Sequence, residues 1–172
     1  MRCRRFLIAS AIAASQIVVS AQRPPAAASD IKAAYLYQFG RYVEWPTALD
    51  DLTVCVVGDE AVASALQTLS RGDTGAGRVV VRRGPIAGTS DAACRIVFIG
   101  RDEPDTAALL KALDGKPTLA VGDDPAFLRG GGMIAFIPQG PKIRFSVNLG
   151  AAQAAHLRVS SQLLKLAVDV IR

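Results

Sequence analysis

The feature that most constrains the fold is a repeated alternation of short apolar runs with amphipathic segments through the middle of the chain. Four of these runs lack helical caps and are typical of strands buried on both faces: residues 52–57, 79–81, 95–99 and 118–121. Helical patterns separate the first run from the second and the third from the fourth. A strand-helix-strand unit has a right-handed crossover and a parallel strand pair. The alternation therefore predicts a single three-layer α/β domain with a mostly parallel central sheet and helices on both faces.

The pattern changes after three consecutive glycines. Residues 133–138 and 143–149 form two extended runs around a turn, and the second run alternates apolar side chains with Arg144, Ser146 and Asn148. Such alternation predicts a strand with one buried face and one wet face. We therefore expect a C-terminal antiparallel hairpin that extends the sheet and presents a polar surface.

Two helices are predicted after the hairpin. Asn148 can cap a short helix that ends near His156, and residues 161–172 place apolar side chains on one face of a last helix. His156 is the only histidine, so any Ser-His-Asp or Cys-His catalysis would depend on it. Its place at a helix end is more simply explained by a turn.

An opening helix is predicted within residues 30–46, where apolar side chains recur at steps of three and four. Ser29 or Asp30 offers an N-cap oxygen, and Pro46 should end the helix near Glu44. The helix is rich in aromatic side chains, which at helical spacing mostly pack into a core. This helix is therefore expected to lie on the sheet.

The end of this helix also permits a binding interpretation. Trp45 is the only tryptophan, and a ring held between a helix end and a proline is a rigid apolar anchor for a partner or ligand. We expect this surface to form where the helix end meets the polar face of the hairpin. Its predicted residues are Arg41, Glu44, Trp45, Arg144 and Asn148.

The first 21 residues read as a signal peptide. They combine three arginines, a short apolar run and small residues at the spacing that signal peptidase recognises, with cleavage near Ala21. An uncleaved anchor is the alternative, although the apolar run is too short to span a bilayer as a resident helix. Residues 22–28 would then be a mobile linker and residues 29–172 the folded domain. The predicted location is the periplasm.

Removing this leader changes the charge of the protein. The whole chain has 20 basic and 15 acidic residues. The leader takes three arginines and no acid with it, so 17 basic and 15 acidic residues remain and the net charge falls from +5 to about +2. So small an excess gives no support for nucleic-acid binding.

Two cysteines remain after the leader, Cys55 and Cys94. An even pair in an oxidising compartment predicts a disulfide, and two buried free thiols are the alternative. No CxxC motif or Cys/His cluster suggests a metal site. We expect no metal and no cofactor.

Three aspartates are candidates for binding a metal or for acting as acid and base, because ligands of open α/β sheets bind beyond the carboxyl ends of strands. Asp59, Asp123 and Asp124 follow two predicted strands that end in similar Val-Gly-Asp sequences. Each also stands where a helix needs an N-cap, and we favour that role. The glycine-rich loop at residues 72–77, GDTGAG, lacks the Lys-Ser/Thr ending of a phosphate loop and is read as a plain turn.

Four segments together resemble the YfiR family, exported proteins related to the periplasmic repressor of an inner-membrane diguanylate cyclase. The segments are KAAYLYQFGRYVEWP, the VCVVGD and CRIVFIG strands, GGMIAFIPQGPKIRFSVNL, and LRVSSQLLKLA. The resemblance runs from about Ile31 to Val170 in the same order and spacing. The chain departs from the family at Gln38, Ser146 and His156, where asparagine, glutamate and glycine are common.

The resemblance implies a regulatory binding protein rather than an enzyme. It would repress the periplasmic sensor part of a membrane diguanylate cyclase and so control cyclic-di-GMP signalling and biofilm formation. A small-molecule ligand and a homodimer remain open as further partners. The alternatives are a periplasmic small-ligand receptor or carrier, and a hydrolase that uses Asp59, Asp123 or Asp124.

Overall fold

A computed structural model describes residues 27–47, 51–71, 78–84, 94–140 and 142–172. The predicted signal peptide lies outside the described residues, as do most of the predicted linker and the glycine-rich loop at 72–77.

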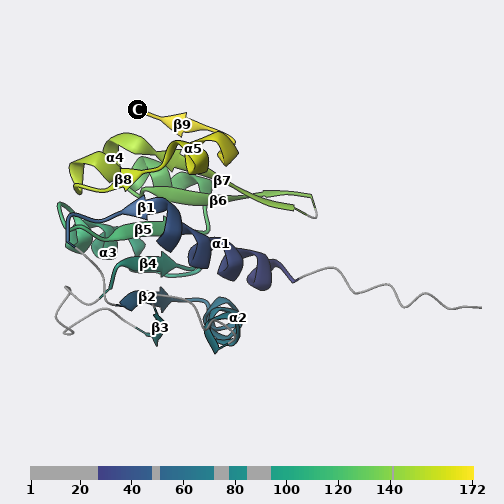
Figure 1. The fold of residues 1–172 in the computed structure, drawn as a ribbon. Coiled ribbons are helices and arrows are strands. Elements are labelled where there is room, and N and C mark those ends of the chain that lie inside the picture. Colours follow the sequence, from purple (N-terminus) through teal and green to yellow (C-terminus); the bar gives the residue numbers. More distant parts are fainter. Residues whose placement is uncertain (1–26, 48–50, 72–77, 85–93, 141) are drawn as a thin grey trace, which may run out of the picture.

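Seven strands form one twisted sheet in the order β3-β2-β4-β5-β6-β7-β9 (Figure 1). They are β2 (Asp51–Val57), β3 (Arg78–Arg83), β4 (Ile96–Ile99), β5 (Leu119–Gly122), β6 (Ile134–Gln139), β7 (Lys142–Asn148) and β9 (Val170–Ile171). The first five pair in parallel, β6 and β7 form the antiparallel hairpin, and β9 runs parallel to β7. The predicted mostly parallel sheet and its C-terminal hairpin are confirmed.

Helices cover both faces of this sheet. They are α1 (Ala28–Tyr42), α2 (Glu60–Arg71), α3 (Thr106–Leu113), the 3-10 helix η2 (Pro125–Gly130), α4 (Leu149–Ala154) and α5 (Ser161–Leu166). The chain moves from β2 out to β3 in one direction and from β4 to β5 in the other, so right-handed crossovers place α2 and α3 on opposite faces. α1 packs beside α2.

Aromatic side chains hold α1 on the sheet, as the core interpretation of its rings predicts. Tyr35 and Phe39 contact the rings of Phe136 in β6 and Phe145 in β7, with centroid distances of 5.3–6.1 Å. Phe39, Phe136 and Phe145 are fully buried. Offset and edge-to-face ring pairs of this kind add to the free energy of burial. The hairpin and the opening helix are therefore one packed unit.

The two ends of α1 differ from the prediction. The helix begins after Ala27, which provides no side-chain cap, so a cap at Ser29 or Asp30 is wrong. It ends at Tyr42 rather than near Glu44, because Val43 is extended and starts the short strand β1 (Val43–Glu44). This strand pairs with β8 (Arg158–Val159) from the far end of the chain.

The last predicted helix is also too long. Ser160 caps α5 as a helix of only six residues, and Ala167 is extended. The backbone N–H of Val168 then donates to the carbonyl of Phe145, which leads into β9. Branched Val168, Val170 and Ile171 suit an extended edge strand better than a helix.

The polar face of β7 is less exposed than the alternation predicted. Phe145 faces α1, so Ser146 points to the opposite side of the sheet, where it is only 6% exposed. The expectation of a wet face is therefore wrong at this position.

Cys55 in β2 and Cys94, just before β4, form a disulfide with a Cα–Cα distance of 5.8 Å. Both residues are buried. The predicted pairing is present in the structure.

Candidate functional site

α1 crosses the sheet from the carboxyl end of the parallel strands to their amino end. Near its beginning, Lys32 lies beside Asp59 and Asp123, which follow β2 and β5. Near its end, Gly40 packs against Leu52 at the start of β2, so closely that a Cβ there would collide with a methyl carbon of Leu52. The beginning of α1 therefore contacts the carboxyl-end edge of the sheet, and its end contacts the amino-end edge.

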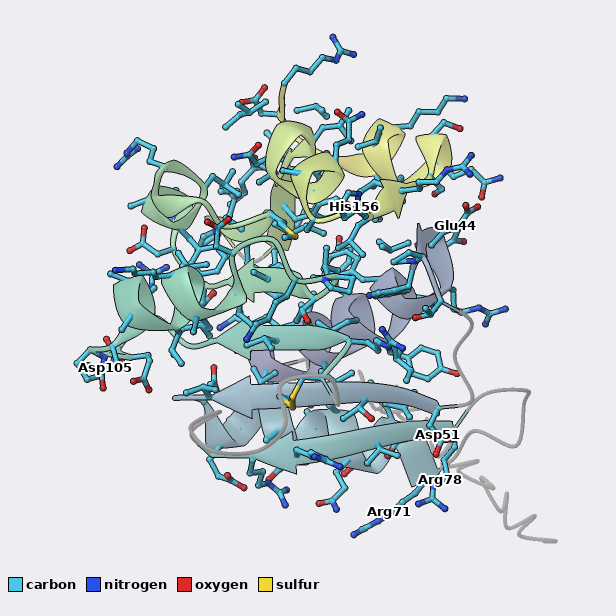
Figure 2. All side chains as sticks on the ribbon, turned by 90° about the vertical axis from the view of Figure 1, so that its left-hand side faces the viewer. Glu44, Asp51, Arg71, Arg78, Asp105 and His156 are labelled. Carbon is cyan, nitrogen blue, oxygen red and sulfur yellow. A yellow bond between two sulfur atoms is a disulfide. The ribbon has the colours of Figure 1, made fainter. Side chains whose placement is uncertain are left out.

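The amino-end edge carries what we call the α1-end surface, which consists of Arg41, Glu44, Trp45 and Arg158. Figure 2 shows Glu44 on the same side as the strand starts Asp51 and Arg78, with Asp105 on the opposite side. The β1–β8 pairing sets Glu44 opposite Arg158, and Arg158 Nε lies 3.6 Å from Glu44 Oε2. Arg41 is exposed. The end of α1 is therefore surrounded by solvent-exposed basic and acidic side chains.

Trp45 lies half-buried between this surface and the core. Its indole Nε1 is buried and is the one such side-chain polar atom without a hydrogen-bond partner among the described residues. A buried donor left unpaired costs about 1–3 kcal/mol. Trp45 thus combines packing with an unsatisfied polar group.

The structure does not bring all five predicted surface residues together. β5 ends at Gly122, which pairs with Ala135 of β6. Arg144 pairs with Ile137, two residues further along β6 and so beyond the end of β5. This places Arg144 toward the carboxyl end of the sheet, away from Glu44. Its guanidinium donates to the carbonyl of Leu166 at 3.2 Å, so it tethers the end of α5.

Both polar groups of the Asn148 side chain form hydrogen bonds within the fold. Its Oδ1 accepts from the N–H of Ala151 at 3.0 Å, which confirms the predicted cap of α4. Its Nδ2 donates to the carbonyl of Leu128 at 3.4 Å. Arg41, Glu44 and Trp45 are therefore the part of the predicted surface that the structure keeps together.

Two of the three aspartates are caps, as predicted. Asp59 accepts from the N–H of Val62 at 3.0 Å, and Asp124 accepts from the N–H of Ala126 at 2.7 Å. Asp123 is different, because it is buried and accepts a 2.6 Å hydrogen bond from Lys32 Nζ. Its predicted role as a cap is wrong.

Lys32, Asp59 and Asp123 form what we call the Lys32 cluster. Lys32 Nζ lies 3.8 Å from Asp59 Oδ2 and is largely buried. Sequence reasoning missed Lys32, although one signal was available: a cation near a helix N-terminus opposes the helix dipole unless acidic groups compensate it. The cluster contains two carboxylates and one ammonium group, so one negative charge is in excess.

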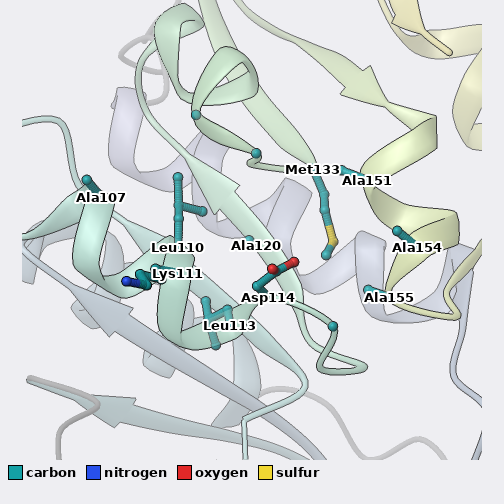
Figure 3. A pocket seen from close by; sticks show the side chains of 13 residues that line it. Ala107, Leu110, Lys111, Leu113, Asp114, Ala120, Met133, Ala151, Ala154 and Ala155 are labelled. Carbon is teal, nitrogen blue, oxygen red and sulfur yellow. The ribbon is translucent and has the colours of Figure 1, made fainter.

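Two cavities flank α3 on the other face of the sheet. The α3–α4 pocket has a volume of about 340 Å³ and is lined by Met133, by alanines of α4 and by Lys111 and Asp114 at its rim (Figure 3). The β4–β5 pocket, with a volume of about 430 Å³, lies beyond the carboxyl ends of these two strands and includes Asp123 in its wall. Both volumes fall in the range of small-molecule sites.

The usual ligand position of an open α/β sheet is closed in this protein. The strand order reverses between β2 and β4, and ligands commonly bind at such a switch point. Here a Cβ added to Gly100 would lie 2.5 Å from the carbonyl oxygen of Gly58. The two loops are in contact, so the open space lies one strand further, between β4 and β5.

The described residues contain no group of three or more His, Cys, Asp or Glu side chains that could hold a metal ion. Within the same residues, no helix is both long and apolar enough to cross a membrane. The sheet and its covering helices define the chain as an α/β domain. The model of the YfiR/HmsC-like family matches residues 29–168, and the chain belongs to this family. At the level of the family, this is a group of regulatory proteins related to a periplasmic repressor of a diguanylate cyclase, as the sequence resemblance indicated.

Proposed function

We propose that this protein is an exported, non-enzymatic regulator that represses the periplasmic sensor part of an inner-membrane diguanylate cyclase. It would reach the periplasm through the signal peptide at residues 1–21, act there as the domain of residues 29–172, and lower cyclic-di-GMP and biofilm formation. The observation that carries this proposal is the family match, which covers nearly the whole domain.

The partner would bind at the α1-end surface. Trp45 provides an aromatic anchor, and exposed Arg41 and Glu44 supply orienting charges beside it. Interfaces concentrate their binding energy in such aromatic anchors, while surrounding charges govern association rate and specificity. A partner group that accepts a hydrogen bond here would also satisfy the unpaired indole Nε1–H, which can only donate.

The partners of the aspartates support a regulator over a hydrolase. Asp59 and Asp124 cap helices, and Asp123 is held by Lys32. A general acid or base needs a free carboxyl group within reach of a substrate proton. Each of these carboxylates instead forms a hydrogen bond or an ion pair within the fold.

The test is co-expression with the candidate cyclase, followed by affinity purification from membranes and measurement of cyclic-di-GMP. The Arg41→Ala/Glu44→Ala double variant should fold and lose at least tenfold in partner affinity and in repression. Asp105→Ala, an exposed change on the opposite side of the molecule in Figure 2, is the matched control and should repress normally. Normal repression by the double variant, in folded protein, would place the interface elsewhere.

Arg144 is tested separately. Because its guanidinium holds the Leu166 carbonyl, Arg144→Ala should loosen the end of α5 while leaving partner binding at the α1-end surface intact. A loss of repression without a loss of stability would instead return Arg144 to the interface.

A further inference from the structure

The last strand of the sheet, β9, and the segment before it carry exposed apolar side chains. The described residues include four exposed large apolar side chains, and three of them lie between residues 166 and 171. These three, Leu166, Val168 and Ile171, are 56%, 46% and 41% exposed. The fourth, Leu69, belongs to α2 at the other end of the sheet (Figure 1). A single exposed apolar side chain is ordinary, but several at one sheet edge mark a contact surface.

The three side chains border the same edge of the sheet. β9 is the last strand in the sheet order, and in the described part of the chain it pairs only with β7. The segment before β9 is also fixed to β7, because the N–H of Val168 donates to the carbonyl of Phe145 at 2.8 Å. Arg144 holds the carbonyl of Leu166 in the same way. We call Leu166, Val168 and Ile171 the β9 edge.

The surroundings of the β9 edge are basic. β7 and the segment from residue 165 to 172 contain four basic side chains and one acidic side chain: Lys142, Arg144, Lys165 and Arg172 against Asp169. Among the described residues, no carboxylate forms an ion pair with any of these four basic side chains. Four positive charges and one negative charge leave a net charge of +3 beside the apolar side chains.

Two kinds of protein partner fit this edge poorly. A second copy would bring two basic edges together across a two-fold axis, and like charges that face each other in an interface lower affinity. A strand added by another protein needs free backbone groups at the edge. β9 has only two residues, and the N–H of Val170 already donates to Asp169 Oδ1 at 2.9 Å. The edge therefore favours an occupant that is anionic and apolar and that needs no backbone hydrogen bonds.

We propose that the β9 edge binds the surface of an anionic phospholipid membrane. The three aliphatic side chains enter the boundary between headgroups and acyl chains, and the basic side chains beside them contact lipid phosphate groups. Binding to a membrane surface strengthens with buried apolar area and with attraction between basic residues and anionic lipids. This edge is distinct from the α1-end surface. The inference goes beyond the proposed repression, because binding to lipid vesicles needs no cyclase.

The test is co-sedimentation of the exported protein with sucrose-loaded vesicles at pH 7. One set of vesicles contains phosphatidylethanolamine and phosphatidylglycerol at 7:3, and the other contains phosphatidylcholine alone. In 50 mM NaCl the partition coefficient should be at least tenfold higher for the anionic vesicles. Raising NaCl to 300 mM should lower it at least fivefold, because salt screens exposed charges. Equal partition to both sets, or no co-sedimentation with 1 mM anionic lipid, would overturn the proposal.

Apolar variants locate the contact. Leu166→Ser/Val168→Ser should lower partition to the anionic vesicles at least tenfold. Leu69→Ser changes a similarly exposed side chain on α2 and is the matched control, which should bind normally. Both variants keep the same N-terminal segment, so their comparison does not depend on the leader. Equal losses in the two variants would refute the assignment to the β9 edge.

Charge variants test the electrostatic part and keep the test available if the apolar variant is unstable. Lys165→Glu should lower partition to the anionic vesicles at least threefold. Lys111→Glu is its control, because Lys111 is also an exposed lysine in the last turn of a helix, and should change partition by less than twofold. Equal effects of the two changes would show that overall charge governs binding and would contradict the proposal.

Light scattering tests the competing occupant, a second copy of the chain. The protein should be a monomer in solution without lipid. A dimer that becomes a monomer in Leu166→Ser/Val168→Ser would assign the β9 edge to a second copy and overturn the proposal.

Discussion

Removing the disulfide should lower the stability of the domain substantially. The bridge joins Cys55 and Cys94 across a sequence separation of 39. Closing a loop of that length removes entropy from the unfolded chain that corresponds to about 4 kcal/mol at 25 °C in the chain-entropy model. For a domain of this size, 1 kcal/mol shifts Tm by roughly 2–4 °C. The expected fall in Tm is therefore about 8–16 °C.

The assay is urea unfolding of the oxidised protein, the same protein with reductant, and the Cys55→Ala/Cys94→Ala variant. Trp45, the only tryptophan, provides the fluorescence signal. Reduction and double substitution should lower the free energy of unfolding by similar amounts, and reductant should have no effect on the variant. Both cysteines are buried, so a small extra loss in the variant is expected from missing sulfur atoms. A fall of less than about 1 kcal/mol in both cases would refute the loop-entropy reasoning.

Five further variants, at four positions, separate other contributions to stability. Lys32→Met leaves two partly buried carboxylates without their cation and should lower the free energy of unfolding in urea by about 3–5 kcal/mol. Arg158→Ala breaks only the exposed ion pair with Glu44 and should lower it by less than about 1 kcal/mol. Equal losses in the two variants would contradict the difference expected between a buried and an exposed ion pair. His156 has a φ of 60°, so His156→Gly should raise Tm, and a lower Tm would show that its side chain matters more than its backbone. Trp45→Phe removes the unpaired indole N–H and should unfold at nearly the same urea concentration as the unsubstituted protein. Trp45→Ala should lose about 2–3 kcal/mol of stability, measured by calorimetry, because it leaves a cavity. A large loss of stability in Trp45→Phe would mean that Nε1 has a hydrogen-bond partner in solution.

Much of the sheet could be predicted because its central strands are buried on both faces and read as continuous apolar runs. What failed depended on partners distant in sequence. Val43 leaves the helix because β8 is there to pair with it, and the end of the chain leaves α5 because β7 offers an edge. Neither strand has a local signal strong enough to oppose a helical pattern.

The site was harder to predict for the same reason. Asp123 has the same local sequence as a capping aspartate, yet its partner Lys32 is 91 residues away. For Arg144, alternation predicted the face of β7 correctly but carried no information on what covers that face or how far along the sheet it lies. The position of His156 is an exception: the sequence departs there from a common family glycine, and the structure shows a left-handed backbone.

The continuity of α1 has a mechanical consequence. Its 15 residues form one rod about 22 Å long, because each helical residue advances the axis by 1.5 Å. Lys32 is held near one end of the rod, and Trp45 stands just past the other. Backbone hydrogen bonds make a helix stiff along its axis, so a shift of the whole helix along that axis at Lys32 would also move β1. The fluorescence of Trp45, the only tryptophan, would therefore report such a shift at the amino-end edge of the sheet.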